Sequence, residues 1–258
     1  IEYVRGKDSS LLHAAVTPRF IPACTDAMLE GLAGIADEYG CHIQTHCSES
    51  DWEHRYVIDR LGASDAQSLD RFGLLTDRTI LAHSIFVDNE DLTTIKRRDS
   101  GIAHCPLSNL YLSHAVFPAR RALDRGLKLG LGTDIAGGAS PSIFDNCRMA
   151  VSASRALEDG VDPALPSDKR GTPGSGINFR EAFWMATAGG ARALGLNTGR
   201  FAAGCAFDAI VVDTRVGDSN LTTWEGMDSH DDVLQKIVYN ASRSNVADVW
   251  VQGRRVSG

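Results

Sequence analysis

Short apolar stretches alternate along the chain with segments in which apolar residues recur at helical spacing. We expect strands at 11–16, 42–46, 78–86, 101–105 and 127–134. We expect helices between and after these strands, at 26–38, 51–62, 89–98, 117–126 and 142–160. Strands that alternate with helices at this spacing predict a parallel sheet, and their almost wholly apolar composition predicts burial on both faces. The pattern therefore indicates an α/β fold.

This order of strands and helices fits two α/β architectures, a doubly wound sheet and a (β/α) barrel. No G-x-G-x-x-G motif follows a predicted strand, which disfavours a dinucleotide-binding domain. Barrel enzymes carry their functional groups at the carboxyl ends of the strands. Polar residues gather here at or just after the predicted strand ends: Arg19, His46, Glu49, His83, His104 and Asp134.

The last part of the chain follows a different pattern. Residues 159–178 are rich in Gly, Pro and Ser, which predicts a long surface loop, and a helix is expected at 178–196. Strands expected at 207–213 and 246–253 have no crossover helix of the earlier kind. We therefore expect a separate β piece packed beside the main domain.

Composition and charge narrow the class of protein. Hydrophobic residues make up 43% of the 258 residues and charged residues 23%, as in ordinary globular domains. The formal net charge of −7 argues against a nucleic-acid partner. No apolar run reaches the roughly 18–20 residues of a membrane helix, and no secretory signal opens the sequence. The six cysteines form no C-x-x-C pair, so we expect reduced thiols in a cytoplasmic protein.

Three of the polar residues at strand ends have the chemistry of metal ligands. On a barrel, His46, His83 and Asp134 would converge on one mouth. Two imidazoles and one carboxylate suit Zn²⁺ or Fe²⁺. Such a metal lowers the pKa of bound water to about 7, which provides a nucleophile at neutral pH. Glu49 follows His46 by three residues and is placed to take the water's proton and pass it to a leaving amine.

Each of these residues also has a purely structural interpretation. A histidine at a strand end is often a core residue, and this applies most directly to His42 and His104. Asp134 in "GTDIAGG" could cap the following helix, and Glu49 could be a solvated first-turn residue favoured by the helix dipole. Their recurrence at one strand end after another favours a single site over independent accidents.

Several motifs resemble those of a known family: "TPRF" (17–20), "HIQTHCSE" (42–49), "ILAHSIF" (80–86), "IAHCPLSNLYLS" (102–113) and "LGLGTDIAGG" (129–138). On these motifs the chain resembles the amidohydrolase superfamily, and within it the guanine deaminases. The resemblance implies a (β/α)8 TIM-type barrel, here with only about the last five strand–helix units, plus a small β piece near the C-terminus. It implies a catalytic partial barrel at 1–200 and a β-sandwich-like segment with a helix at 201–258.

The resemblance also implies roles for the residues at the strand ends. The metal would be zinc, with iron as the alternative, and its ligands would be His46, His83 and Asp134. The catalytic residues would be Glu49, His83 and Asp134, with Glu49 as the proton shuttle. The implied reaction is hydrolytic deamination of guanine to xanthine and ammonia by a cytoplasmic homodimer, with no nucleic-acid or membrane partner.

The small-molecule substrate, guanine, would meet a second group of residues, namely Arg19, Phe20, His46, Glu49 and Asp134. Arg19 would donate hydrogen bonds to the purine carbonyl, because its planar guanidinium matches the acceptors of a flat heterocycle. Phe20 would pack on the purine ring. The structural alternatives are a surface ion pair for Arg19 and a plain core position for Phe20.

The chain departs from the family pattern in one respect. The H-x-H pair of the first barrel strand is absent from these 258 residues, as is the glutamine that follows it in the family. We expect the chain to correspond to the C-terminal portion of such an enzyme. Two alternatives stay open: another amidohydrolase that acts on a different heterocycle, and a non-catalytic remnant of the barrel.

Overall fold

A parallel sheet forms the centre of the protein, whose computed structural model describes residues 1–257. Its five strands lie side by side in the order in which they occur along the chain. They are β1 (Ala15–Val16), β2 (His42–Cys47), β3 (Thr79–His83), β4 (Gly101–His104) and β5 (Lys128–Leu131). A doubly wound sheet reverses its strand order at one point, whereas an unbroken order of parallel strands is that of a barrel wall. The topology therefore supports the barrel interpretation.

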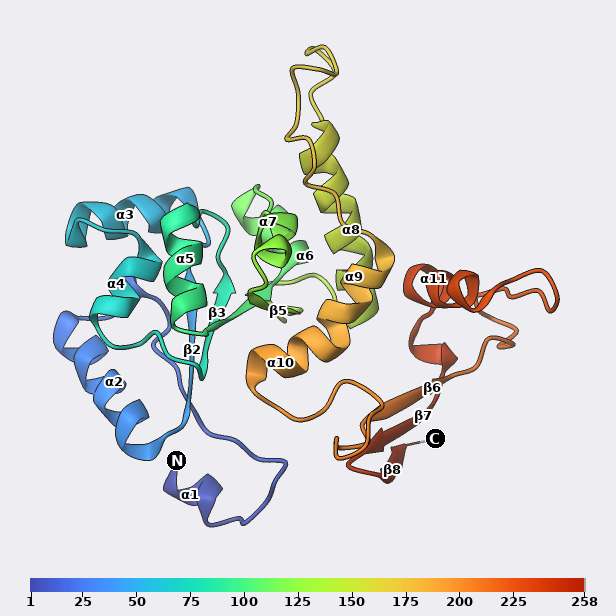
Figure 1. Ribbon diagram of the computed structural model, residues 1–258, viewed down its shortest axis with the longest axis horizontal. Coiled ribbons are helices and arrows are strands. Elements are labelled where there is room, and N and C mark those ends of the chain that lie inside the picture. Colours follow the sequence, from blue (N-terminus) through green and yellow to red (C-terminus); the bar gives the residue numbers. More distant parts are fainter. Residues whose placement is uncertain (258) are drawn as a thin grey trace.

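The helices that connect the strands lie around this sheet (Figure 1). Every helix expected between the strands is present, with shifts at the ends. The expected helices and their observed bounds are α2 (Asp26–Tyr39), α3 (Asp51–Leu61), α5 (Asn89–Arg97), α7 (Ala119–Asp124) and α8 (Ile143–Asp159). Three short helices were not expected: α1 (Glu2–Arg5), α4 (Asp65–Arg71) and α6 (Pro106–Ser108), the last continuing as a π-helical turn, Asn109–Ser113.

The first strand is shorter than its apolar stretch predicts. Only Ala15 and Val16 pair with β2, where they face His42 and Ile43. Leu11 and Leu12 are 57% and 50% exposed, so they contribute little to the core. The expected strand at 11–16 is therefore wrong over its first residues.

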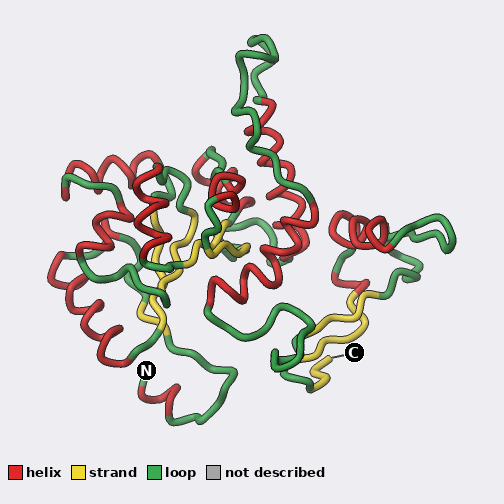
Figure 2. The backbone as a smooth tube through the Cα atoms, in the orientation of Figure 1, coloured by secondary structure: helices red, strands yellow, loops and turns green. Residues whose placement is uncertain are grey.

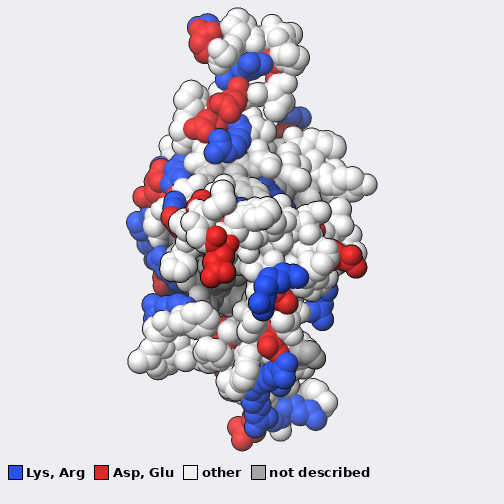
Figure 3. Space-filling view, turned by 90° about the vertical axis from the view of Figure 1, so that its right-hand side faces the viewer, with Lys and Arg blue, Asp and Glu red and all other residues white. Residues whose placement is uncertain are grey.

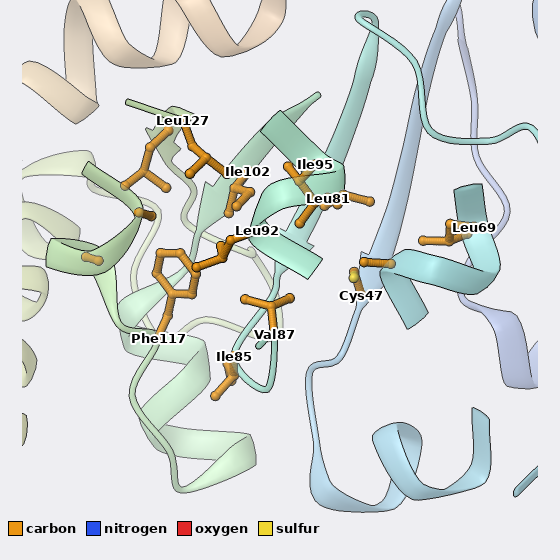
Figure 4. Close-up of a cluster of buried hydrophobic side chains, with 14 of the residues drawn as sticks. Cys47, Leu69, Leu81, Ile85, Val87, Leu92, Ile95, Ile102, Phe117 and Leu127 are labelled. Carbon is orange, nitrogen blue, oxygen red and sulfur yellow. The ribbon is translucent and has the colours of Figure 1, made fainter. Parts of the chain in front are cut away.

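The core lies where β3 and β4 meet α5, as Figure 4 shows. Leu81 of β3 and Ile102 of β4 are fully buried, and Leu92 and Ile95 of α5 pack in the same cluster. Phe117, just before α7, lies beside them. Burial of each such side chain stabilises the fold by about 1.5–3 kcal/mol. This packing holds the strands whose ends carry the polar residues.

Glycines allow the helix that follows the long loop to pack closely on the sheet. A Cβ added at Gly130 of β5 would lie 2.8 Å from the Cα of Gly190, closer than real Cβ atoms approach a neighbour. The helical segment consists of α9 (Phe179–Trp184), a π-helical turn (Met185–Gly189) and α10 (Gly190–Leu194). The expected helix at 178–196 is thus confirmed, and its close packing on β5 requires glycine at 130 and also at 189, where an added Cβ would lie 2.5 Å from the backbone oxygen of Leu129.

The C-terminal region forms a second, antiparallel sheet. Its strands are β6 (Ala209–Val212), β7 (Val246–Val251) and β8 (Arg254–Ser257), and α11 (His230–Asn240) lies between β6 and β7 in the sequence. The tube in Figure 2 places these strands apart from the parallel sheet. The division of the chain at residue 200 stays a prediction.

The surface carries both signs of charge. On the face in Figure 3, acidic and basic side chains lie interspersed over the whole height of the molecule. The end of α8 and the mostly exposed loop after it project from the body (Figure 1). Among residues 1–257, none of the helices combines the length and the apolar character that crossing a bilayer requires.

Candidate metal centre

Two histidines and one aspartate from three different strand ends meet at the carboxyl edge of the parallel sheet. His46 lies near the end of β2, His83 is the last residue of β3, and Asp134 follows β5. One ligand atom from each residue lies within 4.8 Å of the other two. The rings of His46 and His83 stack with their centroids 5.2 Å apart and their planes 24° apart. The three residues that the sequence singled out as ligands are therefore together.

Hydrogen bonds orient both imidazoles. Nδ1 of His46 donates to the backbone oxygen of Arg19 at 2.7 Å, and Nδ1 of His83 donates to Oδ1 of Asn109 at 2.9 Å. Since a neutral imidazole carries one proton, both Nε2 atoms keep a free lone pair. Nε2 of His83 is buried and has no hydrogen-bond partner among the described residues. A divalent cation would satisfy this atom, so the residues present fit a metal such as zinc.

Asp134 is held in the loop that follows β5. Its backbone adopts a left-handed conformation with φ of 49°, and its Oδ2 accepts a hydrogen bond from Oγ of Ser108 at 2.5 Å. A Cβ added at Gly137 would lie only 2.6 Å from this oxygen, so the loop needs glycine to pass the carboxylate. The hydroxyl of Ser142 caps α8. Asp134 is therefore free of the capping role considered from the sequence.

Glu49 approaches the cluster from the loop after β2. Its Oε1 lies 3.7 Å from Nε2 of His83, and the Glu49 side chain is 21% exposed. The N-cap of α3 is Ser50, so Glu49 lies outside the helix and is no first-turn residue. A carboxylate at this place can exchange a proton with a group bound near His83.

A buried pair of carboxyl groups lies behind Glu49, and sequence reasoning missed it. Oε2 of Glu53 accepts a hydrogen bond from the backbone N–H of Glu49 at 2.8 Å. Oδ2 of Asp65 accepts one from Oγ of Ser48 at 3.0 Å. Burial and the charge of Asp65 raise the pKa of Glu53 to about 9, so the pair holds one proton at neutral pH. The available signal was the helical period, which puts Glu53 on the same buried face as Val57.

His104 does not join the cluster. It is fully buried, its ring packs 5.2 Å from that of Phe117, and it is not among the three grouped ligands. Burial, and to a lesser extent the charge of His83, lower the pKa of His104 to about 3. Burial also raises the pKa of the neighbouring Cys105 thiol to about 12. Both side chains are therefore neutral at physiological pH, as the core interpretation of His104 requires.

Arg19 and Phe20 lie beside the cluster. The ring of Phe20 is 6.2 Å from that of His46, and the Arg19 guanidinium lies 5.0 Å from the centre of the Phe20 ring. Phe20 is half-buried and Arg19 is exposed. Among residues 1–257 no ion pair holds Arg19, so the surface ion pair considered from the sequence has no partner there. The two side chains form a flat, cationic rim next to the histidines.

Comparison with known proteins places this geometry in a family. Residues 1–256 match the sequence profile of the Amidohydrolase family. The chain belongs to the amidohydrolase family. As a member, it shares its fold with TIM-barrel relatives, and the five parallel strands are the part of that barrel which this chain supplies.

Three relatives of this amidohydrolase illustrate the likeness. It is 37% identical over 247 residues to a probable guanine deaminase of Schizosaccharomyces pombe, covering 94% of this chain and 45% of the relative. A crystal structure of guanine deaminase from C. acetobutylicum with bound guanine superposes with a TM-score of 0.83 at 29% identity, covering 98% of this chain and 58% of the other. A crystal structure of an adenosine deaminase from Xanthomonas campestris with bound zinc superposes with a TM-score of 0.82 at 25% identity, covering 98% of this chain and 54% of the other. The amidohydrolase chain thus spans about half the length of the relatives that it matches.

Proposed function

We propose that this amidohydrolase catalyses the metal-dependent hydrolytic deamination of guanine to xanthine and ammonia. The observation that carries the proposal is the meeting of His46, His83 and Asp134 beside the Arg19–Phe20 rim. The cluster supplies a place for a metal, and the rim supplies a flat surface with hydrogen-bond donors for a purine. The similarity to enzymes named guanine deaminase supports the choice of substrate.

The proposed ligands of the metal are His46, His83 and Asp134, since these residues offer two nitrogen donors and one carboxylate. Zinc is the proposed metal, with iron as the alternative, because both accept such donors. When bound, the metal lowers the pKa of water to about 7 and polarises the carbon that is attacked.

In the proposed mechanism Glu49 moves the protons. Its carboxylate takes a proton from the attacking water and returns it to the amino group, which leaves as ammonia. The carbon–oxygen bond forms first and makes the carbon tetrahedral, and the carbon–nitrogen bond then breaks, so one water is consumed for each ammonia released. Asp134 assists as a second proton acceptor, and His83 polarises the purine from the side where Glu49 approaches it.

Arg19 and Phe20 hold the purine in this proposal. The guanidinium donates hydrogen bonds to the purine carbonyl oxygen, and the Phe20 ring packs on the heterocycle. His46, Glu49 and Asp134 contact the reacting edge. We also propose that the functional form is a cytoplasmic homodimer, and that residues 1–200 and 201–258 form its catalytic and C-terminal domains.

A second candidate is deamination of a different purine. The likeness to an adenosine deaminase is almost as strong in structure as that to a guanine deaminase. The base of adenosine has no carbonyl oxygen, so its ring offers the Arg19 guanidinium no carbonyl acceptor. The contribution of Arg19 to rate therefore separates the two candidates.

The test measures ammonia release from guanine and from adenosine with the full-length protein and its Arg19→Ala variant. We expect the wild type to prefer guanine. The variant should lose about 10²-fold or more in kcat/KM for guanine, because the purine carbonyl oxygen would have no hydrogen-bond donor in the binding site. The matched control is Arg78→Ala, an exposed arginine at the opposite end of β3, which should leave kcat/KM unchanged. Equal activity of wild type and Arg19→Ala on guanine would contradict the proposal.

A further inference from the structure

Two consecutive buried residues each bond to a different member of the metal cluster. Ser108 and Asn109 are 0% and 1% exposed, and they join α6 to the π-helical turn after it. Asn109 bonds to His83, and Ser108 bonds to Asp134. Neither residue belongs to the three grouped ligands. Their role is therefore to be sought in what they do to His83 and Asp134.

The place of this dipeptide in the fold explains how it reaches both partners. The α6 helix begins directly after β4, with Pro106 in its first turn. Since β4 lies between β3 and β5 in the sheet, a residue just beyond β4 is next to the ends of both neighbours. His83 ends β3 and Asp134 follows β5. The backbone N–H of Asn109 donates to the carbonyl of Cys105 at 2.9 Å, which fixes the turn.

The bond from His83 to Asn109 selects the histidine tautomer. An amide oxygen only accepts hydrogen bonds, so Nδ1 of His83 must carry the proton when it bonds Oδ1 of Asn109 at 2.9 Å. Nε2 then has the lone pair, and this buried atom has no partner in the described part of the chain. Without the amide oxygen, nothing would hold the proton on Nδ1. A proton on Nε2 would occupy the lone pair that binds a cation.

The bond from Ser108 to Asp134 fixes the rotation of the carboxylate. A hydroxyl that donates to Oδ2 at 2.5 Å occupies that oxygen and holds the plane of the carboxylate. Asp134 has a left-handed backbone conformation and lies beyond the end of β5, in a loop that contains Gly137 and Gly138, so no strand or helix holds its carboxylate. The hydroxyl replaces the restraint that a strand or helix would give.

We propose that Ser108 and Asn109 are positioning residues that pre-set His83 and Asp134 for a divalent metal ion. This inference rests on the metal site of the proposed function. Ser108 orients the carboxylate and Asn109 holds the imidazole as the tautomer with a free Nε2. Partners of this kind contribute about 10–100-fold to metal affinity.

The test compares zinc affinity across four variants of the full-length protein, measured by competition with a chromophoric chelator. Asn109→Leu removes the acceptor at similar volume, and Asn109→Asp keeps an oxygen at the same place. Ser108→Ala removes one hydroxyl. The matched control is Ser113→Ala in the same π-helical turn, because Oγ of Ser113 has no hydrogen-bond partner in the described chain.

We expect Asn109→Leu to weaken zinc binding about 10–100-fold, Ser108→Ala to weaken it about tenfold, and Asn109→Asp to restore it to within about threefold of wild type. Ser113→Ala should match wild type. The visible absorption of the Co²⁺-substituted protein should change in Ser108→Ala and not in Ser113→Ala, since it reports ligand geometry directly. Melting curves of the metal-free proteins show which variants fold.

Two results would overturn the inference, and they differ in whether the proposed function also fails. Zinc affinity and a Co²⁺ spectrum equal to wild type in a folded Ser108→Ala and Asn109→Leu would refute the positioning role alone and leave the proposed function intact. A wild type that binds no zinc and no iron would refute both. If Asn109→Leu does not fold, Ser108→Ala decides, since it removes a single oxygen.

Discussion

The two sheets of this protein differ in what their strand ends bring together. In the parallel sheet, every strand ends at the same edge, and His46, His83 and Asp134 meet there. In the antiparallel sheet β6–β8, strand ends alternate between two edges, so side chains from successive ends cannot gather at one point. The candidate metal site therefore lies on the parallel sheet.

Burial follows the same division. All five residues of β3 are buried, whereas the residues of β8 are all exposed and those of β6 are exposed or half-buried. A buried strand positions its last side chain rigidly, because close packing restricts its movement. The grouped residues His46, His83 and Asp134 therefore come from the ends of strands of the parallel sheet, and β6–β8 contribute none of them.

The largest expected effect comes from removing a ligand at the carboxyl end of β2. His46→Ala should abolish stoichiometric zinc binding, because two donors hold zinc much more weakly than three. His42→Ala is the matched control, since His42 begins the same strand and its Nε2 bonds the carbonyl of Leu194 at the opposite edge. Metal analysis of both purified variants makes the measurement. Full zinc occupancy in His46→Ala would show that His46 is a structural residue and no metal ligand.

The next effect concerns the proton path. Glu49→Gln should lower kcat by about 10²–10⁴ while zinc remains bound, because glutamine keeps the shape of the side chain and cannot accept the proton. Glu90→Gln, an exposed first-turn residue of α5, should leave kcat unchanged. Steady-state kinetics with metal analysis gives the result. Unaltered turnover in Glu49→Gln would exclude this carboxylate from the mechanism.

The two sheets should also respond differently to truncation of an apolar side chain. Leu81→Ala in β3 should lower the free energy of unfolding by about 2–5 kcal/mol, because Leu81 is fully buried and leaves a cavity. Val211→Ala in β6 should cost less than about 1 kcal/mol, because Val211 is 46% exposed. Urea denaturation measures both. Equal losses would mean that the antiparallel sheet is as firmly packed as the parallel one.

A further expected effect is a pH dependence of stability set by Glu53. Its pKa is about 9 in the folded protein against an ordinary 4.5, so the folded state retains a proton that the unfolded state releases. Stability from this group is therefore complete below the unfolded pKa and is lost as the pH rises toward 9. Glu53→Gln removes this loss, so the variant should gain stability relative to wild type between about pH 5 and about pH 9.

Urea denaturation across that pH range tests the role of Glu53. Glu90→Gln again serves as the control, since Glu90 is exposed. Parallel curves of unfolding free energy against pH for wild type and Glu53→Gln would show that the Glu53 carboxyl ionises normally in the fold.

The sequence was sufficient to predict the grouping of residues that recur at the ends of apolar strands. His46, His83 and Asp134 follow apolar strands, and parallel strands impose a common edge, so the grouping followed from periodicity and family resemblance. The three residues of α6 make less than one turn and show no period. The buried face of α4 includes Asp65 and Ser68, so its apolar repeat is interrupted by polar residues.

The supporting polar residues could not be found in this way. Ser108 and Asn109 stand in "PLSN" like any loop residues, and only the three-dimensional fold places them between the ends of β3 and β5. Glu53 and Asp65 resemble solvated helix residues in the sequence. The helical period puts Glu53 on the face of Val57, but the burial of both carboxyl groups depends on how α3 and α4 pack, which is a property of the tertiary structure.

The most direct test of the account is anomalous scattering at the zinc absorption edge from crystals of the full-length protein grown with zinc. The account predicts one strong peak at about 2.0–2.2 Å from a nitrogen of His46, a nitrogen of His83 and an oxygen of Asp134. A zinc peak at a different place, with these three side chains facing solvent or protein instead, would contradict it.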